Sequence, residues 1–362
     1  MARVSSKQVA DYAGVSIATV SHVINGTRFV RAETRQKVLD AISALHYRPN
    51  AVARGLATNS TREIGLVVSD IRNPFFTAAA RGVEDEFITH RYNTIFCNTD
   101  EDLKREEENL HLLAAQQIDG LIIAPTGERC EALLALARSG LPIVQIDRVS
   151  PGLATPWVRV NNAEGAYQAV NYLIGLGHRR IAYLMGLEAV STQIERLTGW
   201  KQALQEAGIP FDERLILQAD PRFYSTSPVD AEPTDLPAVQ RHALRSAREV
   251  MGAALMRPDR PSAFFVATNQ LALGALYAIA ECGLRCPEDI SLISFDDQDW
   301  APLFRPPLTV VRQPTYQLGQ TAARLLLKLI RGEPAESPPP LAVELVIRAS
   351  CSAPANGGQS QR

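Results

Sequence analysis

The segment VSIATVSHVING, residues 15–26, carries short polar side chains at close spacing. Ser16, Thr19, Ser21 and Asn25 each offer a hydroxyl or an amide group. Such short donors suit phosphate oxygens, as do the free backbone N–H groups at the start of a helix. Helix capping and solvation are the alternative explanation for the same residue types. The chemistry expected of this segment is therefore either phosphate contact or simple capping of a surface helix.

The residues around this segment show short helical patterns and no strand pattern. SKQVADYAG begins at a cap-type residue, Ser6, and ends at Gly14, the residue that favours the positive φ of a helix end. Ser16 then caps SIATVSHVI, and RAETRQKVLDAISALHY has the apolar spacing of a longer amphipathic helix. Three short helices with a tight glycine turn between the first two predict a helix-turn-helix headpiece over residues 1–47.

A short linking segment follows the headpiece. Pro49 ends the preceding helix and can begin a new one, and residues 51–56 are long enough for about two helical turns. A helix this short is marginal on its own in water. The sequence therefore predicts a hinge helix and linker over residues 48–61.

From residue 64 the pattern changes to alternating strands and helices. The predicted strands are 64–70, 93–98, 119–125, 141–147, 158–161, 179–186, 213–220, 262–268 and 289–296, and the predicted helices among the first of them are 75–90, 101–116 and 130–138. Apolar strands separated by helices favour parallel sheets covered on both faces. The strands are too numerous for one comfortable sheet, so we expect an α/β core of two doubly wound parallel-sheet subdomains with a hinge near Asn161.

These patterns divide the chain into regions. The core is expected over residues 62–352, with an N-subdomain of about 62–160 and 315–340 and a C-subdomain of about 161–314 and 341–352. Residues 221–240 contain four prolines without any period and are expected to form an irregular insertion. The tail, 353–362, is expected to be disordered.

Composition sets the broad class of protein. The chain has 362 residues, 46% apolar and 21% charged, which is typical of a globular protein of two or three domains. No apolar run approaches the roughly 18–20 residues that cross a bilayer, and the first residues lack the apolar stretch of a signal peptide. We therefore expect a cytoplasmic protein without a membrane partner.

The charge is distributed unevenly. The first 61 residues hold eight basic and three acidic residues, a net charge of +5, which leaves −7 for the rest of the chain. A basic head on an acidic body favours contact between the head and a polyanion.

Signals of metal, cofactor or catalytic sites are weak. The five cysteines are scattered, and Cys282 and Cys286 have no nearby histidine or second cysteine pair, so no zinc site is expected. GLGHRR at 175–180 is not a dinucleotide fingerprint, and neither a P-loop nor a G-x-S-x-G elbow occurs. We expect no metal, no cofactor and no enzyme activity.

The N-terminal pattern resembles the DNA-binding domain of the LacI/GalR family of bacterial transcription regulators. VADYAGVS-x-x-TVS-x-V-x-NG, V-x-x-x-TR-x-KV and Y-x-PN-x-VAR-x-L occur in this order at the family spacing. The resemblance implies that Ile17, Ala18 and His22 point into the major groove. His22 departs from the arginine most often found in the family, and its ring cannot fork onto guanine as arginine does. Apolar contacts from Ile17 and Ala18 favour thymine methyl groups.

The same resemblance implies that the linking segment binds DNA. Hinge helices of two subunits are implied to fold together in the minor groove, where Leu56 inserts between base pairs and Asn50 and Arg54 lie near the backbone or the groove floor. A marginal helix suits coupled folding and binding. The alternative is a plain linker helix with Leu56 packed on the core.

Residues 62–350 resemble the core of the same family and, through it, the periplasmic sugar-binding proteins. Strings such as IGLVVSDIRNPFF, ERLTGW and PEDISLISFDD carry the resemblance, which implies a small-molecule site in the cleft between the subdomains. The implied effector-binding residues are Phe75, Phe76, Asp147, Arg196, Asn269, Asp296 and Gln313. Packing, capping or surface ion pairs are the alternative roles for these side chains. Gln270 stands where the family usually has an acid, which affects either the cleft or the start of a helix.

The sequence thus predicts a homodimeric transcription regulator, in the first place a repressor, that binds pseudo-palindromic operator DNA with an affinity set by an effector. A sugar or sugar derivative suits Arg196 and Asp296, and nucleobases also bind such clefts. The sign of the effector's action is open. The alternative function is a periplasmic-type sugar-binding protein without a DNA function, and a Rossmann-like enzyme is a more distant one.

Overall fold

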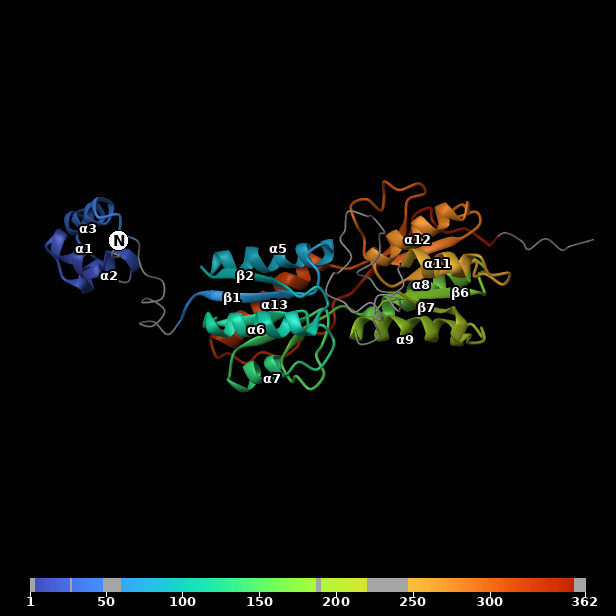
Figure 1. Ribbon diagram of the computed structural model, residues 1–362, viewed down its shortest axis with the longest axis horizontal. Coiled ribbons are helices and arrows are strands. Elements are labelled where there is room, and N and C mark those ends of the chain that lie inside the picture. The colour runs from blue at the N-terminus through green and yellow to red at the C-terminus, as the bar shows by residue number, and fades with distance from the viewer. Residues whose placement is uncertain (1–3, 27, 48–59, 187–189, 220–246, 355–362) are drawn as a thin grey trace, which may run out of the picture. The chain divides into compact units, whose positions relative to one another are not determined.

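The computed structural model describes residues 4–26, 28–47, 60–186, 190–219 and 247–354, which belong to two compact units, 1–61 and 62–362 (Figure 1). Among these residues no helix has both the length and the apolar character that a membrane span requires. Three predicted features lie outside the described residues: the hinge helix with Asn50, Arg54 and Leu56, the insertion at 221–240, and residues 355–362 of the tail.

The first unit consists of α1 (Ser6–Ala13), α2 (Ile17–Asn25) and α3 (Ala32–Ala44). Its core is made of small or branched apolar side chains from all three helices, namely Val9, Ala10, Val20, Val23, Val38 and Ala41. Gly14 ends α1 with a φ of 65°, a left-handed conformation in which a side chain would be strained. The tight turn that the sequence predicted between the first two helices is therefore formed by this glycine.

The N-cap of α1 is Ser5, and the prediction of Ser6 was wrong. The Ser5 hydroxyl accepts a hydrogen bond from the Gln8 N–H at 3.3 Å, and the Gln8 side-chain oxygen accepts one from the Ser5 N–H at 2.8 Å. This reciprocal capping box requires Gln three residues after the cap, a spacing that Ser5 satisfies and Ser6 does not.

The first half of the second unit is a five-stranded parallel sheet in the order β2-β1-β3-β4-β5. Its strands are β1 (Glu63–Val68), β2 (Asn93–Asn98), β3 (Gly120–Ile123), β4 (Ile143–Ile146) and β5 (Trp157–Val158). Its helices are α5 (Pro74–Thr89), α6 (Leu103–Ala115), α7 (Glu131–Arg138) and, from late in the sequence, α13 (Thr315–Ile330). Figure 1 shows α13 within this half of the core, where Tyr316 donates a hydrogen bond to Asp85 of α5 at 2.9 Å.

Both faces of this sheet are covered, which explains its continuous apolar strands. Along β1, Ile64, Leu66 and Val68 pack in a cluster with side chains of α5 and α13. Val67 belongs to a second cluster with side chains of α6 and α7. Because successive strand residues point to opposite faces, a sheet buried on both sides needs apolar residues at every position.

The second half is a six-stranded sheet in the order β11-β10-β9-β8-β6-β7. Its strands are β6 (Ile181–Met185), β7 (Ile216–Gln218), β8 (Ala263–Val266), β9 (Ser291–Phe295), β10 (Thr309–Arg312) and β11 (Glu344–Val346). Its helices are α8 (Asn162–Gly175), α9 (Ser191–Glu206), α11 (Ala247–Leu255) and α12 (Asn269–Glu281). Two doubly wound subdomains, as the sequence predicted, make up the core.

One prediction about the sheets and two about single strands need correction. The edge strand β11 runs antiparallel to β10, so the second sheet is mixed; an edge strand has a partner on one side only and tolerates either direction. The predicted strand at 213–220 is shorter because a 3₁₀ turn, Glu213–Leu215, occupies its start. The predicted strand at 158–161 is replaced by β5 and a single bridge between Val160 and Leu341.

Candidate functional sites

The strand order of each sheet reverses at one point, and such a point is where a site is expected. In the first sheet β1 lies between β2 and β3, and in the second β6 lies between β7 and β8. Ligands of open parallel sheets bind beyond the carboxyl ends of the strands at such a reversal of order. Asp147 follows β4 and Asp296 follows β9 directly, so both stand at strand carboxyl ends.

Arg196, on α9 of the second subdomain, is a buried residue of the candidate effector site. Its side chain is 3% exposed, and its guanidinium lies 3.7 Å from the centre of the Phe295 ring. The Nε atom donates a hydrogen bond to the Asn162 side-chain oxygen at 2.9 Å, and Nη1 donates to the carbonyl of Ala267. The sequence interpretation identified Arg196 but not these partners, which fix the position of the guanidinium.

Three further predicted residues meet beside it. Asp296 accepts a hydrogen bond from the Gln313 side-chain amide and one from the Asn269 backbone N–H at 3.4 Å. All three side chains are at least nine-tenths buried. The Asn269 side-chain oxygen and the Gln313 side-chain oxygen have no hydrogen-bond partner among the described residues. These two unpartnered acceptors are the groups most suited to receive donors from a bound molecule, since buried polar atoms rarely remain unpaired.

The first subdomain contributes a buried carboxylate next to a buried arginine. Arg148 donates to Asp147 at 3.3 Å through Nε and to both oxygens of Glu101 at 2.6 and 2.8 Å. Phe76 lies 5.8 Å from the Arg148 guanidinium and 5.0 Å from Phe75, ring centre to ring centre, in an edge-to-face pair. Both predicted phenylalanines are thus buried near this cluster. Sequence reasoning missed Glu101 and Arg148, although Arg148 is adjacent to Asp147 in the chain.

The two subdomains contact each other through side chains of this region. The Asn269 side-chain amide of α12 donates to the Asn73 oxygen at 2.9 Å, and Asn73 caps α5 in the first subdomain. Gln270 donates to Asp70, just after β1, at 2.8 Å. The predicted effector residues of the two subdomains therefore lie on either side of one interface.

The pKa values of the two acids at this interface, Asp147 and Asp296, are raised by burial, and the charge of Asp296 adds to the rise at Asp147. Burial raises the pKa of Asp147 to about 6, with Arg148 and Arg196 opposing the change and Asp296 adding to it. Burial also raises the pKa of Asp296, against the effect of Arg196 and its hydrogen bonds. Both acids have a positive φ, 63° for Asp147 and 75° for Asp296, a strained conformation that is concentrated at functional sites.

The raised pKa of Asp147 predicts a pH dependence of stability. A carboxyl that binds its proton more tightly when folded stabilises most below its unfolded pKa of 3.8, and this stabilisation is lost as the pH rises through about 6. Asparagine tolerates a positive φ, so Asp147→Asn should raise the free energy of unfolding at pH 7 by about 2 kcal/mol and flatten its change between pH 4 and 6. Urea unfolding at several pH values measures both.

Glu108→Gln is the control for this experiment because Glu108 is an exposed acid on α6. It should leave the pH profile unchanged. An Asp147→Asn variant with the pH profile of the original protein would show that Asp147 does not titrate in this range.

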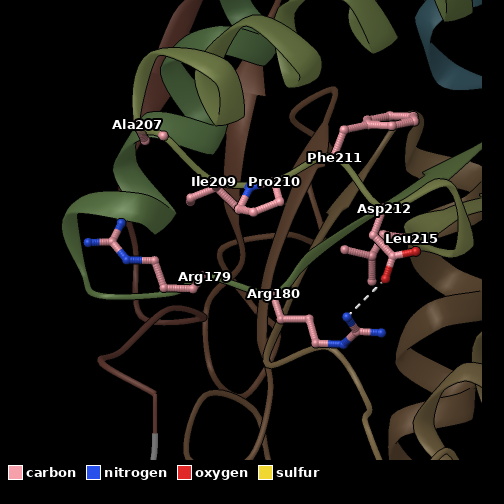
Figure 2. A pocket seen from close by; sticks show the side chains of 9 residues that line it. Arg179, Arg180, Ala207, Ile209, Pro210, Phe211, Asp212 and Leu215 are labelled. Carbon is pink, nitrogen blue, oxygen red and sulfur yellow. Dashed lines mark hydrogen bonds and ion pairs between the residues drawn. The ribbon is translucent and has the colours of Figure 1, made fainter.

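The open hollows described on the surface lie elsewhere. Figure 2 shows one of about 540 Å³ between the start of β6 and the end of α9, lined by Arg179, Arg180, Ala207, Gly208, Ile209, Pro210, Phe211, Asp212 and Leu215. Arg180 pairs there with Asp212 at 3.0 Å. A second hollow adjoins the other side of the same loop. None of the predicted effector residues lines either hollow. The hollows lie at the amino end of β6, whereas ligands bind such sheets at the carboxyl ends of the strands.

In the headpiece, α2 has a buried side and an exposed side. Val20 and Val23 are buried, whereas Ser16, Ile17, Ala18 and Ser21 are exposed and Thr19 and His22 are half-buried. The Ser16 hydroxyl accepts a hydrogen bond from the Thr19 N–H at 3.1 Å, so Ser16 caps α2 as the sequence predicted. Ile17 is 50% exposed, which leaves its side chain available for contact. The side chain of Asn25 lies outside the described residues.

A helical headpiece and a core of two doubly wound subdomains define a regulator with a binding-protein-like core. Residues 7–50 match the model of the bacterial regulatory proteins of the lacI family, residues 61–226 that of the periplasmic binding proteins and sugar binding domain of the LacI family, and residues 170–351 that of the periplasmic binding protein-like domain. The chain belongs to the LacI family.

Individual relatives agree. The chain is 38% identical to the HTH-type transcriptional repressor PurR of Photobacterium profundum, over 90% of this chain and 91% of the relative. The Lac repressor dimer bound to operator and the anti-inducer ONPF is 29% identical, with a TM-score of 0.80 over 97% of this chain and 100% of that one. A LacI family regulator from Enterococcus faecium with bound ribose is 29% identical, with a TM-score of 0.67 over 80% of this chain and 99% of that one. The function is that of a DNA-binding transcription regulator, not that of a solute-binding protein.

Proposed function

We propose that a small molecule bound between the two core subdomains controls the operator affinity of this regulator. The observation that supports the proposal is the pair of buried, unpartnered acceptors on Asn269 and Gln313, next to an interface between subdomains. A ligand that binds there contacts both subdomains, so it has a different affinity for each of their relative arrangements. Such a difference is the requirement for allosteric control.

The chemistry of the site supports a hydroxyl-rich effector. Asp147, Asp296 and the two unpartnered oxygens are all able to accept hydrogen bonds from a ligand, and Phe75 and Phe76 supply an apolar wall nearby. A sugar or sugar derivative combines many donors with an apolar ring face. The ribose bound to the Enterococcus faecium relative is consistent with this class. A nucleobase is the second candidate, since ring N–H groups also donate to carboxylates.

For DNA recognition we propose that α2 enters the major groove of a pseudo-palindromic operator half-site. Ile17, Ala18 and His22 would contact bases, and Ser16, Thr19, Ser21 and Asn25 would contact the backbone. The segment with Asn50, Arg54 and Leu56 would bind the minor groove. The protein would act in the cytoplasm as a homodimer, consistent with the operator-bound Lac repressor dimer, and without catalysis, a metal or a cofactor.

The experiment that tests this function uses the full chain. Selection from a randomised pseudo-palindromic duplex library should yield a preferred operator, and fluorescence anisotropy should then show its affinity changing with one member of a panel of sugars, sugar phosphates and purines. A thermal-shift screen of the same panel identifies the effector. Absence of sequence-specific DNA binding at moderate salt would contradict the proposal.

His22→Arg should change base preference more than it changes non-specific affinity. An arginine fork binds the guanine edge with two hydrogen bonds, worth about 1–3 kcal/mol of discrimination, whereas one added charge changes non-specific binding only slightly. Library selection and anisotropy measure the two effects. His22→Lys is the control because it adds the charge without the fork. Identical base profiles for the original and arginine proteins would show that residue 22 does not contact a base.

A further inference from the structure

The first turn of α12 contacts the loop after β1 through two neighbouring side chains. Asn269 donates to Asn73 at 2.9 Å and Gln270 donates to Asp70 at 2.8 Å. The residues of each pair are about 200 positions apart in the sequence and belong to different subdomains. The present arrangement of the subdomains is therefore stabilised by direct hydrogen bonds between protein side chains.

Asp70 is held firmly from its own side. Its Oδ1 atom accepts from the Arg72 backbone N–H at 2.9 Å and from Arg72 Nε at 3.0 Å, and its Oδ2 atom accepts from Arg72 Nη2 at 3.2 Å. The residue is 4% exposed. A buried carboxylate fixed in this way is a preorganised acceptor, and charge-assisted hydrogen bonds to such a group are the stronger ones.

The amide at position 270 makes the contact with Asp70 attractive, whereas a carboxylate there would make it repulsive. Gln270 offers an N–H to the Asp70 carboxylate. A glutamate has the same length but no such donor, and it would bring a second carboxylate within hydrogen-bond distance of the first, where like charges repel strongly. An acid in the first turn of α12 would gain from the helix dipole, but this gain is the same in every arrangement of the subdomains.

We propose that Gln270 and Asp70 form a latch that holds the two subdomains in the arrangement described here without a bound effector. That the latch also tunes effector response rests on the proposed function. An effector that favours this arrangement binds a protein already biased toward it, and an effector that favours another arrangement must first overcome the latch. Gln270 thus sets the balance that the effector changes, without itself needing to touch the effector.

The test is a double-mutant cycle on the full chain without effector: the original protein, Gln270→Glu, Asp70→Asn and the double variant. Spin labels carried by non-canonical amino acids at positions 104 and 256, both exposed and one in each subdomain, report the distance between subdomains by pulsed electron resonance. This labelling leaves the five native cysteines unchanged, and excess unlabelled protein removes signals between subunits.

Gln270→Glu should lower the population of the original protein's main distance, relative to other distances, at least about fivefold, because repulsion replaces a hydrogen bond. Adding Asp70→Asn should return this relative population to within about twofold of the original, since the new amide at position 70 can donate to the new carboxylate at position 270. Gln270→Met, which removes the donor without adding charge, should give a smaller change that Asp70→Asn does not reverse. The matched control is Gln317→Glu, the same change in the first turn of α13 at an exposed position.

A Gln270→Glu protein with the distances of the original would overturn the latch, as would an effect that persists in the double variant. Operator binding by the same four proteins is measured separately. A distance cycle as expected, in proteins that bind no operator, supports the latch and contradicts the proposed function, so the two failures can be told apart.

Discussion

Arg196→Ala should lower effector affinity at least about 100-fold and abolish the effector's influence on operator binding. The guanidinium is fixed by Asn162, by the Ala267 carbonyl and by the Phe295 ring. Its charge opposes the rise in the pKa of the buried Asp147 and Asp296. A ligand that meets this group gains charge-assisted hydrogen bonds without first ordering the side chain. Titration of the effector by calorimetry and by operator anisotropy measures the loss.

The same substitution should also destabilise the core by about 2–5 kcal/mol, because it leaves the buried Asn162 and Ala267 oxygens without their donor and removes a cation that favours the charged forms of Asp147 and Asp296. Arg196→Lys is the informative companion. It keeps the charge near Asp147 and Asp296 and should recover much of the stability, but a single ammonium cannot make the hydrogen bonds of the fork, so effector affinity should stay low. If the alanine protein folds and responds fully to the effector, the effector binds elsewhere.

Gly319→Ala should lower the free energy of unfolding by about 3 kcal/mol or more. A Cβ atom at position 319 of α13 would stand 2.0 Å from the carbonyl oxygen of Ala79 on α5, and one at Gly82 would stand 2.2 Å from the carbonyl oxygen of Tyr316. Backbone atoms cannot move aside as a flexible side chain can. The two helices must separate, and overpacking of this kind is costly. Urea denaturation measures the change.

Gly252→Ala is the matched control, since this glycine lies within α11 and a Cβ there would meet nothing within 4 Å. The higher helix propensity of alanine should raise stability by about 0.5–1 kcal/mol. Equal stability of the Gly319→Ala protein and the original would mean that α5 and α13 can separate at no cost, contrary to the close crossing described here.

Sequence patterns predicted the parts of the fold that depend on local residue order. Buried strands such as β1 are apolar at every position because side chains on both faces are covered. The turn after α1 was predicted from Gly14, because glycine adopts the positive φ that this turn requires. The cap of α1 was predicted one residue too late, at Ser6, because the spacing to Gln8, the signal that identifies Ser5 as the cap, was not used.

The predicted effector-binding residues lie around one interface between the subdomains, but their partners were not predicted. Asp147 and Asp296 follow apolar strands, so their position at strand ends can be read from the sequence. Glu101, whose two oxygens bind Arg148, is 47 residues away from that arginine. No local pattern connects the two, because their contact depends on which strands are neighbours in the sheet.

Residue order alone was enough to predict a basic helical headpiece, an α/β core of two doubly wound subdomains, and acids at the ends of particular strands. Each of these follows from interactions between residues close in the chain. The role of Gln270 depends instead on the folded core. Its amide meets Asp70, 200 residues earlier, because β1 and β8 direct their carboxyl ends to the same interface. The order of strands in a sheet is a property of the whole fold, so contacts between distant strand ends cannot be read from any one segment.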